Sequence, residues 1–106
     1  MHYRKLGRTG LVVSEIAMGC EGFFEEDCTM AKKLFDEAEK AGINYFDLYA
    51  PNPEMRRAVG EALKGRRDKF IIQGHLCSVW KMGSTCGRGT LRKYKPDLTI
   101  CWVFLA

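Results

Sequence analysis

The chain contains 106 residues with a formal net charge of +4, and 46% of its residues are hydrophobic and 28% charged. This composition indicates a globular chain and excludes a disordered one, while the length falls short of the about 250 residues of a complete (β/α)8 barrel. The basic excess comes from residues 69–106, with 6 basic and 1 acidic side chains. These residues show no recognisable nucleic-acid-binding motif, so we expect no nucleic-acid partner.

The first residues predict a β-hairpin and then a sheet strand. Two short strand-like runs between residues 3 and 13 flank Gly7-Arg8-Thr9-Gly10, whose glycines allow the positive φ angles of a tight connection. The apolar run from Ile16 to Gly19 then fits a buried strand that ends at the glycine.

A helix is expected over residues 29–41. Its apolar residues recur at helical spacing on one face: Ala31, Leu34, Phe35, Ala38 and Ala41. Asp27 or Thr29 would cap the start of this helix, and Gly42 would take the position just after its end.

Strand and helix signals then alternate. Residues 43–47 predict a second strand, and residues 70–74 predict a third. Between them, Asn52 and Pro53 predict the start of a helix over residues 53–64, because asparagine caps helices and proline fits their first turn. The apolar face of that helix consists of Met55, Val59, Ala62 and Leu63.

The three expected strands begin at Ile16, Ile43 and Phe70, at even intervals of 27 residues. Strands that alternate evenly with helices predict a parallel α/β sheet with right-handed crossovers, covered on both faces. Functional residues are therefore expected where the carboxyl ends of these strands meet.

Several segments resemble the aldo/keto reductase family. The opening YRKLGRTGLVVSEIAMGCEGF is similar to the family's hairpin and first barrel strand, AGINYFDLYAPNP to its second strand, and VGEALKGRRDKFII to its helix and third strand. The resemblance covers residues 3–83 and looks like a bacterial subgroup whose full-length members carry a carboxyl-terminal iron–sulfur segment. It implies an α/β fold: an incomplete (β/α)8 TIM barrel with an amino-terminal hairpin and about three parallel βα units.

The resemblance also implies carbonyl reduction with NADPH or NADH, using an Asp, a Tyr, a Lys and a His. Asp47 matches the family's aspartate. Tyr49 follows it in the order Asp-x-Tyr rather than the family's Asp-x-x-x-x-Tyr, so it is either a site tyrosine or a packed aromatic. His75 stands where the family has Thr-Lys, and it is either a proton donor or a hydrogen-bonded histidine at a strand end.

The family's cofactor contacts match Gly19 and Cys20, with Asp47 beside them. A glycine allows a dinucleotide to approach the backbone closely, although a loop glycine beside a buried thiol is the alternative. No metal site is expected, because the five cysteines do not reproduce the clustered spacing of iron–sulfur ligands.

The residues from 84 onward depart from the subgroup. Glycines interrupt any helical pattern, and residues 98–105 are apolar enough for a fourth strand that no helix precedes. A reading-frame shift near Gly83 would explain these features together. We therefore separate a barrel-like portion, residues 1–83, from an atypical tail, residues 84–106.

We expect a cytoplasmic protein, because the start of the chain has no apolar signal region and the cysteines form no Cys-x-x-Cys pair. No membrane partner is expected, since no apolar run approaches the about 18 residues of a membrane span. The expected function is that of the amino-terminal part of an NAD(P)H-dependent oxidoreductase, inactive alone and prone to self-association. The alternatives are a non-catalytic α/β binding module that associates with another chain, and a redox protein that uses the thiol of Cys20 or Cys77.

Overall fold

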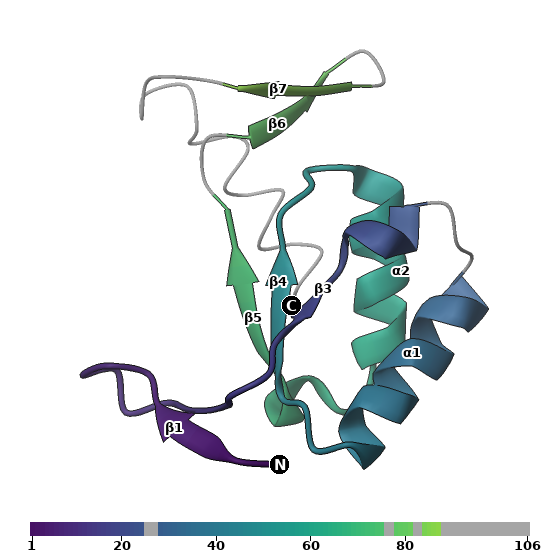
Figure 1. Ribbon diagram of the computed structural model, residues 1–106. Coiled ribbons are helices and arrows are strands. Elements are labelled where there is room, and N and C mark those ends of the chain that lie inside the picture. Colours follow the sequence, from purple (N-terminus) through teal and green to yellow (C-terminus); the bar gives the residue numbers. More distant parts are fainter. Residues whose placement is uncertain (25–27, 76–77, 82–83, 88–106) are drawn as a thin grey trace.

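The computed structural model describes residues 1–24, 28–75, 78–81 and 84–87. Along the chain come a two-stranded hairpin, a three-stranded parallel sheet with two helices, and a second hairpin (Figure 1). Both helices lie on the same side of the sheet. The strand expected over residues 98–105 lies outside the described residues. No helix in the described ranges is long and apolar enough to cross a membrane.

The amino-terminal hairpin is confirmed. Its antiparallel strands are β1 (Tyr3–Lys5) and β2 (Val12–Ser14). Gly7 and Gly10 adopt φ values of 53° and 80°, which residues with a Cβ atom rarely reach. The hairpin is held against the parallel sheet by Asn44, whose Oδ1 accepts the amide hydrogen of Ser14 at 2.7 Å.

The parallel sheet confirms the predicted α/β class. It consists of β3 (Met18–Gly19), β4 (Tyr45–Leu48) and β5 (Ile71–Gly74), in the order β3-β4-β5. Asp47 pairs with Gly19 on one side and with Gln73 on the other. This register brings the carboxyl ends of the three strands to one edge of the sheet.

The first of these strands is shorter and more exposed than the sequence predicted. β3 has two residues where a buried strand was expected over residues 16–19, and Ile16 is 58% exposed. β3 lies at an edge of the sheet, and the described helices cover only one sheet face. For the described part of the chain, the expectation of strands covered on both faces is therefore wrong, and buried and half-buried residues alternate along β4.

Helices α1 (Cys28–Lys40) and α2 (Pro53–Leu63) confirm the two predicted helices within one residue. α2 begins as predicted, because Oδ1 of Asn52 accepts the amide hydrogen of Glu54 at 2.8 Å. Thr29 lies inside α1, so its prediction as the cap is wrong, and Asp27 lies outside the described residues.

The end of α1 is also as predicted. Gly42 has a φ of 79°, and the amide of Ile43 donates to the carbonyl of Ala38 at 2.8 Å. This pairing closes the helix through a left-handed glycine. Two short 3-10 helices complete the secondary structure of this region: η1 (Glu21–Phe24) and η2 (Arg67–Lys69).

Aromatic rings form the centre of the core between helices and sheet. Phe35 of α1 stacks on Phe46 of β4, with ring centroids 4.3 Å apart, and Phe70 packs edge-on against both rings. Phe35 and Phe46 are fully buried. The predicted apolar face of α1 therefore covers the sheet, except for Ala41, which follows the helix and is exposed.

The second hairpin has no counterpart in the sequence prediction. Its antiparallel strands are β6 (Ser78–Lys81) and β7 (Ser84–Gly87). In Figure 1 it lies beyond the carboxyl ends of the parallel strands. The division of the chain at residue 83 and the reading-frame shift stay predictions.

Candidate functional site

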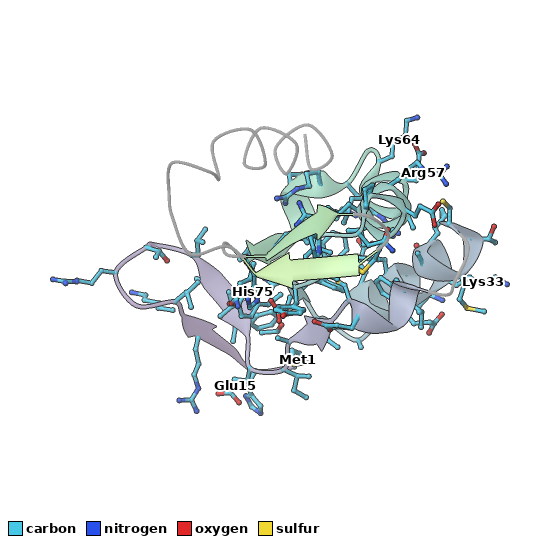
Figure 2. The ribbon with its side chains drawn as sticks, turned by 90° about the horizontal axis from the view of Figure 1, so that it is seen from above. Met1, Glu15, Lys33, Arg57, Lys64 and His75 are labelled. Carbon is cyan, nitrogen blue, oxygen red and sulfur yellow. The ribbon has the colours of Figure 1, made fainter. Side chains whose placement is uncertain are left out.

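Asp47, Tyr49 and His75 lie together at the carboxyl ends of strands β4 and β5. Nε2 of His75 lies 2.6 Å from Oδ1 of Asp47. The ring of Tyr49 lies edge-on to the imidazole, with centroids 5.2 Å apart and planes at 81°. Figure 2 shows His75 well away from Lys33, Arg57 and Lys64 at the helical side of the molecule. The three residues selected as catalytic thus form one cluster.

The strand register explains this cluster. Asp47 pairs with Gln73, and Leu48 with Gly74. His75 comes directly after β5, two residues beyond the partner of Asp47, so its long side chain is on the same sheet face and reaches back to the carboxylate.

The contact between Asp47 and His75 defines the state of the ring. A carboxylate accepts and does not donate, so Nε2 carries a hydrogen in this contact and Nδ1 is left for another partner. The side chains are 36% and 32% exposed for Asp47 and His75 respectively. The pair is therefore held in place and still open to a ligand.

A second polar contact lies next to the pair on the same face. The hydroxyl of Tyr45 donates to Oε1 of Gln73, and Nε2 of Gln73 lies 3.4 Å from Nε2 of His75. Neither Tyr45 nor Gln73 was selected from the sequence. Their two-residue spacing from Asp47 and His75 is the signal that could have found them.

Cys20, which directly follows β3, supports the site without offering a reactive thiol. Its amide donates to the carbonyl of Asp47 at 2.9 Å, and its side chain is fully buried. Burial, followed by the charges of Glu21 and Asp47, raises the pKa of the Cys20 thiol to about 12. The thiol stays protonated at neutral pH, so a redox role for Cys20 is wrong. Cys77 lies outside the described residues.

The carboxylate of Glu21 occupies the space beside the backbone of Gly19. A Cβ atom at Gly19 would lie 2.8 Å from Oε2 of Glu21, so the glycine lets this carboxylate lie against the backbone. A ligand that approaches Gly19 closely requires the flexible Glu21 side chain to turn away. Glu21 was not selected from the sequence, where nothing distinguishes it from an acidic loop residue.

The cluster can exchange protons through the side chains of Asp47, Tyr49 and His75, none of which carries a hydride. The contacts of Gly19 and Cys20 with a nicotinamide cofactor stay a prediction. In the described parts of the chain, no group of three or more His, Cys, Asp or Glu could hold a metal ion.

Comparisons with known proteins bear on this cluster. No family model matches the chain. It is 37% identical over 89 residues to the uncharacterized oxidoreductase YqkF of Bacillus subtilis, covering 79% of this chain and 28% of that protein. It is 31% identical over 102 residues to an Oryza sativa subsp. japonica protein named "Probable voltage-gated potassium channel subunit beta", covering 89% of this chain and 30% of that protein.

The structure is similar to an aldo-keto reductase of Bacillus halodurans that was solved in its holo form. The TM-score is 0.84 and the sequence identity 30%, over 99% of this chain and 36% of that chain. The chain thus spans between 28% and 36% of the length of these relatives.

Proposed function

We propose that this chain, which resembles part of an aldo-keto reductase in sequence and fold, supplies a portion of a barrel-shaped oxidoreductase. The reaction is the NADPH- or NADH-dependent interconversion of a small carbonyl compound and its alcohol. The observation that carries this proposal is the 2.6 Å contact between Asp47 and His75 at the carboxyl edge of the sheet.

His75 is the proton donor in this proposal. When bound, a reduced nicotinamide supplies the hydride for the carbonyl carbon. Nδ1 of His75 gives a proton to the carbonyl oxygen, because Nε2 is engaged by Asp47. Asp47 fixes the ring and offsets the positive charge of a doubly protonated imidazole.

Tyr49 restricts the ring of His75 from the side. Its edge-on contact limits rotation of the imidazole, and its own side chain is 44% exposed. Tyr49 is therefore placed to contact a substrate beside His75.

The chain alone is inactive in this proposal. It spans about a third of its relatives, and a barrel site is built from loops that follow several strands. The free thiols of Cys20 and Cys28 support a reducing compartment, which we take to be the cytoplasm.

A non-catalytic binding module is the second candidate. One relative carries the name of a channel subunit rather than of an enzyme, and β3 and β5 are the outer strands of the described parallel sheet. Such a module would associate with another chain through those edges, with no need for the Asp47–His75 contact.

The test is a chimera in which residues 1–75 of this chain replace the matching segment of the Bacillus halodurans reductase. We expect NAD(P)H-dependent reduction of a simple aldehyde. His75→Phe and Asp47→Asn should each lower kcat by about 10²-fold or more, the usual contribution of a positioned acid. Lys33→Gln, on the exposed side of α1, is the control and keeps the chimera's activity.

Retention of full activity by the His75→Phe chimera contradicts the proposed role of the pair. A chimera that folds and binds NADPH but reduces nothing favours the binding module.

A further inference from the structure

Tyr49 begins the short connection between β4 and α2, residues 49–52. The rest of the connection is buried, whereas Tyr49 is 44% exposed. A partly exposed ring has fewer packing neighbours than a buried one, so its contact with His75 depends on the backbone that carries it. The position of the Tyr49 ring is therefore set by what holds this connection in place.

Arg56, near the amino end of α2, makes two hydrogen bonds to the connection. Its Nε donates to the carbonyl of Ala50 at 3.3 Å, and its backbone amide donates to the carbonyl of Asn52 at 3.1 Å. A charged donor makes a stronger hydrogen bond than a neutral one. Because Ala50 directly follows Tyr49, a fixed carbonyl at Ala50 limits how far the backbone of Tyr49 can turn.

Arg56 is a buried charge that packing alone does not explain. The residue is 4% exposed, and burial of a guanidinium costs free energy unless polar partners satisfy it. The amino end of a helix adds to this cost, because its partial positive charge repels a cation. The hydrogen bond to Ala50 is one of the interactions that offset the cost. The next residue along the helix, Arg57, is exposed.

We propose that Arg56 is a positioning residue that holds the Tyr49 ring against His75 through the carbonyl of Ala50. The inference rests on the proposed function, in which Tyr49 limits rotation of the imidazole and contacts the substrate. Arg56 acts through the backbone of the connection and takes no part in the proton transfer.

The test compares three variants in the full chain: Arg56→Met, Arg56→Lys and the matched control Arg57→Met. Methionine places a methyl group where Nε of Arg56 stood, and lysine keeps the positive charge but places a methylene group there. Arg57 lies on the helical side of the molecule, away from His75 (Figure 2). The measurement is the NMR cross-peak from the nuclear Overhauser effect between the ring protons of Tyr49 and His75, whose ring centroids are 5.2 Å apart.

We expect this cross-peak in the wild type and in Arg57→Met, and its loss in Arg56→Met. In Arg56→Lys the cross-peak should weaken, since no donor is left at the position of Nε. An unchanged cross-peak in a folded Arg56→Met variant overturns the inference, and so does its absence from the wild type. If Arg56→Met does not fold, Arg56→Lys decides in its place, and an unchanged cross-peak there overturns the inference.

The chimera with residues 1–75 shows whether Arg56 acts through Tyr49. Arg56→Met should lower kcat/KM by about tenfold, since a misplacement of about 1 Å in a positioning group can cost up to about 10²-fold. In a Tyr49→Leu background the same change should lower kcat/KM no further, because the group that Arg56 positions is already gone. An equal fall in both backgrounds means a structural role unrelated to Tyr49 and overturns the inference.

The cross-peak needs no turnover, so the two proposals can fail separately. A lost cross-peak in Arg56→Met together with an inactive chimera contradicts the proposed function and leaves the role of Arg56 standing. An active chimera whose Arg56→Met variant keeps its kcat/KM contradicts the role of Arg56 alone.

Discussion

Cys20 and Asp47 are neighbours across two strands, and their chemistry is linked. The Cys20 amide holds the carbonyl of Asp47, while its buried thiol lies close enough to the Asp47 carboxylate for the negative charge to raise the thiol pKa. A neutral thiol adds no second negative charge beneath the Asp47–His75 pair. Burial and the neighbouring carboxylates of Glu21 and Asp47 thus disfavour a thiolate at this position.

The Cys20 thiol makes stability depend on alkaline pH. The folded chain keeps this proton up to about pH 12, whereas an unperturbed thiol loses it near 9.0. Between those values the folded state binds more protons than the unfolded state, so the free energy of unfolding falls by about 1.4 kcal/mol per pH unit. Urea denaturation at about pH 8 and about pH 10 measures this loss.

Cys20→Ala should abolish this fall of the unfolding free energy with rising pH. Cys28→Ala is the matched control, because it leaves Cys20 in place and should keep the fall. An identical pH dependence in wild type and Cys20→Ala contradicts the burial and charge argument.

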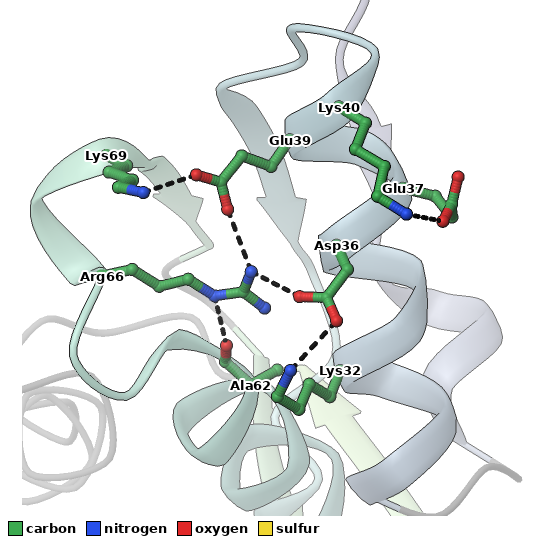
Figure 3. Close-up of polar contacts among 8 residues, drawn as sticks. All are labelled: Lys32, Asp36, Glu37, Glu39, Lys40, Ala62, Arg66 and Lys69. Atoms are coloured by element: carbon green, nitrogen blue, oxygen red, sulfur yellow. Dashed lines mark hydrogen bonds and ion pairs between the residues drawn. The ribbon is translucent and has the colours of Figure 1, made fainter.

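At the scale of elements, Arg66 joins α1 to the end of α2 (Figure 3). Its Nη1 lies 2.5 Å from Oδ1 of Asp36 and 3.0 Å from Oε2 of Glu39, both on α1. Its Nε donates to the carbonyl of Ala62 at 2.9 Å, and the guanidinium lies over the ring of Phe70 at 5.7 Å. One side chain therefore ties the helices to the segment that leads into β5.

Replacement of Arg66 tests this connection. Arg66→Met keeps much of the side-chain volume and removes the hydrogen bond to Ala62 and the contact with the Phe70 ring, at a cost of about 1–2 kcal/mol in unfolding free energy. Lys64→Met is the control, because the Lys64 side chain is 80% exposed and its Nζ lies 3.9 Å from Oε2 of Glu61, the one ion pair it makes within the described part of the chain. Equal urea midpoints for the two variants would contradict the role of Arg66.

The same cluster predicts a loss of stability in acid. Hydrogen bonds from Lys32 and then Arg66 lower the pKa of Asp36 below 3.8, and those from Lys69 and then Arg66 lower the pKa of Glu39 below 4.5. Lowered carboxyl pKa values stabilise the fold above the ordinary values and lose this effect as the pH falls through the lowered ones. The difference in thermal midpoint between wild type and Arg66→Met should therefore narrow below about pH 4. If the difference in thermal midpoint between wild type and Arg66→Met stays constant down to about pH 2, the two carboxylates do not stabilise the fold through Arg66.

The elements that the sequence predicts well are those specified by neighbouring residues. The apolar spacing of α1 and α2, the Asn52 cap of α2 and the glycine that follows α1 are specified by nearby residues, and the alternation of strands and helices follows from local signals. The exposure of Ile16 could not be predicted in this way, because it depends on what covers the edge strand. The β6–β7 hairpin was missed because its short strands show no alternation of apolar and polar residues.

In the candidate site, too, sequence alone identified single residues but not the contacts between distant segments. Asp47 and His75 were selected as single residues, and their contact spans 28 positions of the chain, so it depends on the register of β4 against β5. Gln73 and Tyr45 lie beside the Asp47–His75 pair only because of that same register. Glu21 could not be found from sequence, because its position over Gly19 follows from the turn of η1.

At the scale of the whole molecule, the described sheet is open at both sides. β3 and β5 each pair with one strand, and unpaired strand edges promote association with other chains. Two apolar residues are also exposed: Ile16, just before the outer strand β3, at 58%, and Val12, in β2 of the amino-terminal hairpin, at 48%. Both features leave surface that a second chain can cover.

The chain alone should therefore self-associate. Sedimentation is expected to show a weight-average mass that rises with concentration, and Ile16→Lys should weaken the association because a charge at a sheet edge opposes pairing. Lys33→Gln, on α1, serves as the control and leaves it unchanged. A monodisperse monomer with a cooperative thermal transition above about 50 °C contradicts this expectation.

Chemical rescue tests the central claim, that His75 carries the transferred proton, most directly. In the chimera with residues 1–75, His75→Ala should lower aldehyde reduction by about 10²-fold or more. Added imidazole should restore part of the rate in a saturable manner, since it supplies the missing proton carrier, and the Asp47→Asn chimera should gain nothing from it. Full activity in His75→Ala, or a lost activity that imidazole does not restore in a folded chimera that binds cofactor, would contradict the account.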